Sequence, residues 1–240
     1  CQRVNISKEI GYPVYNELHD LPKPAEAYGI AGWSKDGDRV VLYDRYDMWV
    51  IDLTGKKTIY SLTDGYGRTT NRQFRWLKDD YGDKIIDFEN GFLMTSVNLE
   101  NRDEGIYRFQ ANGKLKKLME GPYSVTVNQK SVDQKYCIFT RQSYTEFRDL
   151  WWSDLAFTRP VKITNTNPQQ KNYLWGSVKL VEWTNLEGKR NRGLLYLPDG
   201  YDSSKRYPVI VNFYETHTET LHDYIVPFWC SGMLNVVSYV

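Results

Sequence analysis

"DMWVIDLTGKKTIYSLTDG", residues 47–65, carries the pattern that decides the fold. An aromatic residue stands in a predicted strand, a turn follows, and a second short strand closes the unit. The pattern returns as EGIYRFQANGKLKKLMEGP at 104–122 and as DLWWSDLAFTRPVKITNTN at 149–167. The aromatic residues that align in the three copies are Trp49, Tyr107 and Trp151. A repeat of roughly 40–60 residues is typical of β-propeller blades.

Two further predicted strands precede each copy. The nearer strands are 39–44, 91–97 and 135–141, and the farther ones are 30–33, 84–88 and 123–128. Four short strands per repeat predict three four-stranded antiparallel sheets between about residues 25 and 170, with almost no helix. Stacking such sheets around an axis buries both of their faces. We therefore expect a mainly β chain in which residues 1–175 are the C-terminal part of a β-propeller.

The stretch GWSKDG, residues 32–37, has the look of a nucleophile elbow, in which a catalytic serine stands between two glycines. Here Asp36 replaces the second glycine, and the residues that follow favour a strand over the helix that an elbow must open. Asp36-Gly37 between two apolar runs is instead typical of a hairpin turn. Ser34 is therefore predicted to be a turn residue. Ser231, in WCSGM, also lacks the preceding glycine and is predicted to be structural.

Composition excludes several classes of function. The net charge is +1, with basic and acidic residues evenly spread, so no basic surface for nucleic acid is expected. No apolar run approaches the length of a membrane span. The three cysteines, Cys1, Cys137 and Cys230, are too few and too scattered for a disulfide framework or a zinc site. The start at Cys1 and the apolar last residues lead us to expect a piece of a longer protein.

One short segment, ETHTETLHDY at 215–224, gathers side chains that could bind a metal ion. They are Glu215, His217, Glu219, His222 and Asp223. On a helix, two histidines five residues apart would point in different directions, and the spacing is not that of H-E-x-x-H. A polar loop is therefore preferred over a zinc or iron site, and we predict neither metal nor cofactor. His19, alone near a proline-rich loop, carries no signal.

The pattern of strands changes after residue 171. Residues 178–183 and 192–197 are predicted strands around a turn at 185–188. The run PVIVNFY at 208–214 is continuously apolar, as expected of a strand buried on both faces of a sheet. Residues 176–240 are therefore expected to hold the first strands of an α/β domain.

The stretch VKLVEWTNLEGKRNRGLLYLPDGYDSSKRYPVIVNFYE, from residue 178, resembles the start of the peptidase domain in the prolyl oligopeptidase family of serine peptidases. The resemblance lies in a strand, a Glu-Gly turn, a second strand that ends before a proline, and Tyr-Pro followed by a hydrophobic strand. The Gly-Trp-Ser-x-Asp-Gly turn and the two Asp-x-Trp-x-x-Asp strands are similar to the propeller of its dipeptidyl peptidase IV-like branch.

This resemblance implies an α/β-hydrolase domain with a Ser-His-Asp triad, capped by a propeller that restricts substrates to short peptides. No G-x-S-x-G occurs in this chain, so the triad is expected beyond Val240 and the chain itself is expected to be inactive. Tyr214 matches the family tyrosine that donates to the oxyanion, although Glu215 follows it where the family has small residues. A tyrosine that only packs at a strand end remains the other interpretation.

The family also implies a secreted or periplasmic location, and the oligomeric state stays open. The alternative function is a propeller without catalytic activity that serves as a binding or scaffold module. A hydrolase homologue that has lost its triad is a third possibility. The sequence that follows residue 240 would distinguish these, because only the peptidase requires a G-x-S-x-G there.

Overall fold

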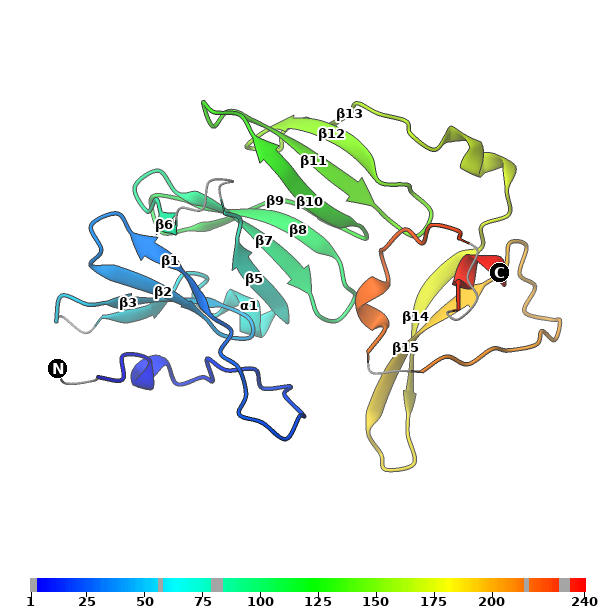
Figure 1. Cartoon of the computed structure of the whole chain (residues 1–240), viewed down its shortest axis with the longest axis horizontal. Coiled ribbons are helices and arrows are strands. Elements are labelled where there is room, and N and C mark those ends of the chain that lie inside the picture. The colour runs from blue at the N-terminus through cyan, green and yellow to red at the C-terminus, as the bar shows by residue number, and fades with distance from the viewer. Residues whose placement is uncertain (1–3, 56–57, 79–83, 214–215, 229–233) are drawn as a thin grey trace. The chain divides into compact units, whose positions relative to one another are not determined.

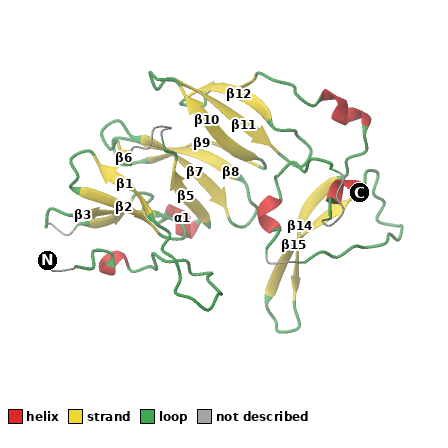
Figure 2. Ribbon diagram, viewed as in Figure 1, coloured by secondary structure: helices red, strands yellow, loops and turns green. Residues whose placement is uncertain are grey.

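Short β-strands are the main regular structure of the described chain, and its few helices are short (Figure 2). The computed structural model describes residues 4–55, 58–78, 84–213, 216–228 and 234–240. The chain divides into two units, residues 1–100 with 104–121 and residues 101–103 with 122–240. In the described part of the chain, no helix is long and apolar enough to cross a membrane.

Three sheets, each built on four antiparallel strands, follow one another along the chain, as the repeat predicts (Figure 1), and the first gains β6 as a fifth strand. The first contains β1 (Ile30–Ser34), β2 (Arg39–Tyr43), β3 (Met48–Asp52) and β4 (Ile59–Ser61). The second contains β5 (Arg72–Trp76), β7 (Phe92–Asn98), β8 (Glu104–Phe109) and β9 (Leu115–Gly121). The third contains β10 (Ser124–Lys130), β11 (Tyr136–Gln142), β12 (Asp149–Asp154) and β13 (Val161–Lys162). The prediction of three such sheets with almost no helix is confirmed, since α1 (Tyr66–Thr69) is a single turn.

The first strand of the second sheet is β5, and the prediction that residues 84–88 form it is wrong. Within that range, β6 (Ile85–Ile86) joins the first sheet instead, parallel to β1. Gly32 permits this approach, because a Cβ there would collide with the backbone oxygen of Lys84. In β5, the buried Phe74 and Trp76 alternate with Gln73 and Arg75, a period of two over a strand too short to form a continuous apolar run.

The two sheets of the first unit share one core. Its side chains include Tyr43, Met48, Phe74, Trp76, Tyr107 and Phe109. The rings of Phe74 and Tyr107, both in the second sheet, meet edge to face with centroids 5.0 Å apart, and Tyr107 belongs to the core that this sheet shares with the first. Trp49 packs against a second cluster of Ile10, Val40 and Ile51, in which Ile10 is the last residue of η1 (Lys8–Ile10).

A carboxylate at the start of the third strand bonds to a threonine beyond the fourth strand in two sheets. In the first sheet, Thr63 donates to Asp47. In the third, the Thr164 hydroxyl donates to Asp149 at 2.7 Å. Burial alone would raise the pKa of Asp149, but hydrogen bonds from Lys162, Thr164 and Thr166 lower it to about 2. These bonds tie a very short outer strand to its neighbour.

The second sheet has Gly105 at the corresponding place and closes differently. The Tyr107 hydroxyl donates to Glu120 at 2.7 Å, and Arg72 binds the same carboxylate through two nitrogens at 2.8 and 3.0 Å. The Glu120 side chain is 9% exposed. The Arg72 guanidinium lowers the pKa of Glu120 against the opposing effect of burial. This cluster links the first, third and fourth strands of the sheet.

The second unit continues past its sheet into η2 (Pro168–Asn172) and the hairpin of β14 (Ser177–Thr184) and β15 (Arg190–Leu197). The predicted hairpin is confirmed, with Gly188 at φ 77° in its turn. The two remaining elements are the short helices η3 (Thr218–Thr220) and η4 (Val236–Ser238). The predicted boundary between a propeller domain, ending at residue 175, and an α/β domain, beginning at residue 176, stays a prediction.

The prediction of a buried strand at 208–214 is wrong for residues 208–213, and Tyr214 lies outside the described residues. Residues 208–213 form no strand, and their apolar side chains are exposed, with Val209 at 76% and Phe213 at 86%. A strand buried on both faces needs neighbouring strands beside it and cover above and below. None of the described segments pairs with this run.

Replacing Glu120 with Gln tests the cluster of the second sheet. The amide keeps the volume but removes the charge that Arg72 compensates, so we expect the free energy of unfolding to fall by about 1–3 kcal/mol at pH 7. Because the pKa of Glu120 is lowered in the folded chain, its contribution is present above its unfolded pKa and is lost as pH falls through the folded value. The loss in Glu120→Gln should therefore shrink at acid pH.

Thermal and urea unfolding between pH 3 and 7 measure this effect. The exposed Glu89→Gln is the matched control and should change the free energy of unfolding by less than about 0.5 kcal/mol. Equal effects of the two substitutions would contradict a stabilising role for the cluster.

Candidate functional site

The site that the sequence predicts centres on Tyr214, which lies outside the described residues together with Glu215. The described residues on its two sides differ. Residues 208–213 are exposed, as stated above. Beyond it, Leu221 and Tyr224 are each only 8% exposed, while Thr216, His217 and Glu219 are exposed. The segment after Tyr214 is therefore attached to the second unit at its far end.

Tyr224 is the centre of this attachment. Its ring stacks on Trp175 with centroids 5.0 Å apart and meets Phe147 edge to face at 4.9 Å. Its hydroxyl accepts a hydrogen bond of 2.8 Å from the Asn167 amide. Burial raises the pKa of Tyr224, so its hydroxyl stays protonated at neutral pH. A tyrosine with both its faces and its hydroxyl engaged is held in one orientation.

Tyr144 holds Trp175, the residue on which the Tyr224 ring stacks. The indole N–H of Trp175 donates to the Tyr144 carbonyl at 2.7 Å, and the Tyr144 hydroxyl donates to the Trp175 carbonyl at 3.1 Å. The ring of Tyr144 also lies 5.4 Å from that of Tyr196 on β15. Burial raises the pKa of Tyr144 to about 12. We call the five rings Tyr144, Phe147, Trp175, Tyr196 and Tyr224 the aromatic junction.

Two polar residues of the segment 216–224 form contacts with other parts of the second unit. The Gln142 amide donates to Asp223 at 3.1 Å, and the Nε2 atom of His222 lies 3.1 Å from both the Asn101 carbonyl oxygen and an Asp103 carboxylate oxygen. Within 4–55, 58–78, 84–213, 216–228 and 234–240, no three His, Cys, Asp or Glu residues are grouped to hold a metal ion. His222 and Asp223 therefore attach their segment to other residues of the second unit. His217 and Glu219 are exposed, and Glu215 is not described.

Ser34 is the last residue of β1 and begins the predicted hairpin turn to β2. Gly37 donates its backbone N–H to the Ser34 carbonyl at 2.9 Å and has φ 78°. The Ser34 side chain is buried, where its hydroxyl donates to Asp36 and accepts from the Arg39 backbone. Neither partner can act as a histidine base, so the hydroxyl is not activated. Ser231 and Cys230 lie outside the described residues.

Cys137 is the described cysteine, and it is buried in β11. Burial raises its pKa to about 11, so the thiol is protonated at neutral pH. A protonated thiol is a weak nucleophile. Cys137 is therefore a core residue.

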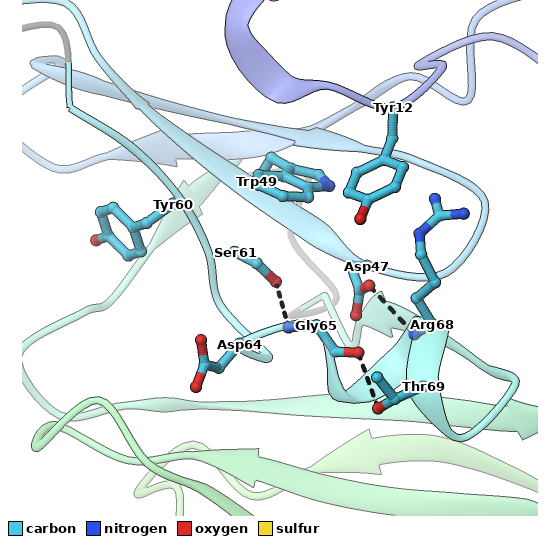
Figure 3. Close-up of a pocket in the computed structure, with 9 residues that line it drawn as sticks. All are labelled: Tyr12, Asp47, Trp49, Tyr60, Ser61, Asp64, Gly65, Arg68 and Thr69. Atoms are coloured by element: carbon cyan, nitrogen blue, oxygen red, sulfur yellow. Dashed lines mark hydrogen bonds between the residues drawn. The ribbon is translucent and has the colours of Figure 1, made fainter.

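The first unit contains a hollow of about 350 Å³ that the sequence did not indicate (Figure 3). It is lined by Tyr12, Asp47, Trp49, Tyr60, Ser61, Asp64, Gly65, Arg68 and Thr69. The guanidinium of Arg68 covers the ring of Tyr12 at 3.8 Å and bonds to Asp44 at 2.9 Å. Burial raises the pKa of Asp47, which accepts hydrogen bonds from Thr63 and from the Gly67 backbone. The charged groups of Arg68 and Asp47 are therefore bound to other residues of the protein. No histidine or cysteine that nucleophilic catalysis could use lines the hollow.

No protein-family model matches the sequence, and no curated protein sequence matches it. Among solved structures, a "putative dipeptidyl aminopeptidase IV" from Bacteroides ovatus matches 75% of this chain at 14% identity and a TM-score of 0.54. The isopeptidase AtxE2 matches 78% of the chain at 14% identity and a TM-score of 0.41. The chain spans only 27% and 33% of these two proteins. At this identity, the first likeness shows a shared fold.

The exclusion of Ser34 can be tested by labelling. We expect a fluorophosphonate probe to leave both Ser34 and Ser231 unmodified, and chromogenic short peptides or esters to be hydrolysed no faster than in buffer. The buried and doubly bonded Ser34 hydroxyl and the missing elbow around Ser231 are the reasons. Mass spectrometry after labelling makes the measurement, with a serine hydrolase as positive control. An adduct on either serine would overturn the assignment of structural roles.

Proposed function

We propose that this chain is part of a serine peptidase of the prolyl oligopeptidase type that cleaves short peptides. The observation that carries the proposal is the order of elements: three four-stranded antiparallel sheets, then the hairpin β14–β15, then the Tyr-Pro run from residue 207. The fold shared with the Bacteroides protein supports this order over most of the chain. In the proposal, the sheets belong to a propeller that limits access to the active site.

The exposed run at 208–213 supports the second half of the proposal. Apolar side chains such as Val209, Val211 and Phe213 lose about 1.5–3 kcal/mol each when left in water instead of buried. The complete protein would recover this free energy by placing the run inside a sheet, with strands on either side. A continuous apolar strand that follows a hairpin in this way would begin an α/β-hydrolase domain.

The chemistry assigned to the complete protein is acyl transfer. A serine hydroxyl attacks the carbonyl carbon of the peptide, its proton passes to a histidine, and the carbonyl oxygen becomes an oxyanion. The amine then leaves with that proton, and water hydrolyses the acyl-serine. Tyr214 would donate its hydroxyl to the oxyanion, which is the only catalytic role assigned to a residue of this chain.

Replacing Tyr214 with Phe in the protein expressed from the complete reading frame tests this role. The substitution removes one hydroxyl and little volume. If the hydroxyl donates only to the developing oxyanion, kcat falls by roughly 10²–10³ while KM changes little. Steady-state kinetics on a short peptide and thermal unfolding are measured on the same preparation.

Tyr201→Phe is the matched control, because Tyr201 is 43% exposed in the same unit. It should leave both kinetic constants unchanged. A tyrosine at position 214 that only packs at a strand end predicts the opposite pattern, with an altered melting temperature and a near-normal kcat. A complete protein without peptidase activity would favour the binding module instead.

A further inference from the structure

The third sheet carries a polar hollow of about 230 Å³ over its first two strands, β10 and β11. It is lined by Ser124, Thr126, Asn128, Thr140, Gln142 and Arg148. Thr126 lies opposite Thr140, and Ser124 lies opposite Gln142. Residues that lie opposite each other in an antiparallel pair point to the same face of the sheet. Pockets that enclose a whole drug-sized ligand measure roughly 300–1,000 Å³, so this polar hollow fits one end of a molecule.

Asn128 belongs to the lining because the pairing of β10 with β11 is irregular at this point. Val127 lies opposite Phe139, and the next pair along the two strands is Gln129 with Ile138. Asn128 is therefore an extra residue with no residue of β11 opposite it. Such β-bulges redirect a side chain, and they are frequent next to active sites.

Arg148 is held beside the polar hollow by a short chain of hydrogen bonds. Its Nε atom donates to the Gln142 amide oxygen at 3.1 Å. The nitrogen of the same amide donates to Asp223 at 3.1 Å, and Gln142 is only 8% exposed. Because both ends of this amide are engaged, Gln142 keeps one orientation, in which its oxygen faces Arg148. The Nε side of the guanidinium is therefore fixed before any ligand binds.

Several hydrogen-bond donors of the polar hollow have no protein partner. Among the described residues, none accepts a hydrogen bond from the Thr126 hydroxyl, the Asn128 side-chain amide or the two terminal nitrogens of Arg148. Arg148 is exposed, so a ligand can reach these nitrogens from solvent. In the described part of the chain, no acidic side chain lines the polar hollow. It therefore offers a guanidinium, an amide and a hydroxyl, which all suit an anion.

We propose that the polar hollow binds a carboxylate, carried by the end of a peptide or by a small organic acid. The planar guanidinium of Arg148 presents two terminal nitrogens that match the two oxygens of a carboxylate. Asn128 and Thr126 supply further donors from β10. A phosphate dianion is matched less well, because Arg148 is the single cation of the described lining and Asp223 is bound to Gln142. This site lies in the third sheet and does not depend on the proposed peptidase activity.

A titration followed by NMR on the ¹⁵N-labelled 240-residue chain tests this proposal. N-acetylglycylglycine, which has a free carboxylate, should shift the signals of the Asn128 side-chain amide and the Arg148 Nε–H, with a dissociation constant of about 1 mM. Its C-terminal amide should shift neither signal. Acetate that binds as tightly as the peptide identifies a small organic acid, whereas tighter binding of the peptide identifies a peptide end. Inorganic phosphate that binds more tightly than both would overturn the assignment to a carboxylate.

Two variants locate the binding. Arg148→Gln, followed at the Asn128 amide, should weaken binding of N-acetylglycylglycine at least about tenfold, because the charge-assisted bonds are lost. Asn128→Asp, followed at the Arg148 Nε–H, places a negative charge in the polar hollow and should weaken binding at least as much. It leaves the bond between Arg148 and Gln142 in place, so it decides alone if Arg148→Gln fails to fold.

Arg159→Gln is the matched control, because Arg159 is an exposed arginine of the same unit that does not line the polar hollow. It should bind the peptide as the unmodified chain does. Equal weakening in Arg148→Gln and Arg159→Gln would overturn the proposal, since it would indicate a general effect of charge. Equal binding of the peptide acid and its amide, or no shift of either signal, would also overturn it.

Discussion

Short outer strands are the weak point of this architecture, and buried carboxylates hold them in place. β4 has three residues and β13 has two, so few backbone hydrogen bonds attach them. Asp47 and Asp149 add a bond to a threonine just beyond each strand. The pKa of Asp149, lowered to about 2, corresponds to about 2 kcal/mol of stability at neutral pH that is lost on acidification. In the second sheet, Glu120 on the outer strand instead accepts a hydrogen bond from the Tyr107 hydroxyl.

In the third sheet, Asp149 lies close in sequence to the residues that bind the segment 216–224. Asp149 also binds Thr166, and the chain continues from there through Asn167 to Trp175. Asn167 and Trp175 are both partners of Tyr224. The carboxylate that closes the third sheet thus lies next to the residues that receive the segment after Tyr214. The contacts that close the third sheet and those that bind Tyr224 are therefore neighbours along the chain.

The sequence indicated the three sheets and the hairpins, because aromatic residues and Asp-Gly or Glu-Gly turns act locally. It failed for β5, where Gln73 and Arg75 alternate with the two apolar residues, and for residues 208–213, whose burial depends on segments that do not pair with them here. The docking of Asp223 and Tyr224 could not be predicted, since their partners are dozens of residues away. The pattern around His222 favours a polar loop over a metal site, and the Nε2 atom of this histidine lies 3.1 Å from the Asn101 carbonyl oxygen.

Identification of the nucleophile in the product of the complete reading frame tests the central claim most directly. After reaction with a fluorophosphonate, the account predicts a single adduct by mass spectrometry, on a serine within a G-x-S-x-G that follows residue 240. Competition by a short peptide should slow its formation. A product that hydrolyses no peptide and carries no adduct, or an adduct on a serine of the three sheets, would contradict the account.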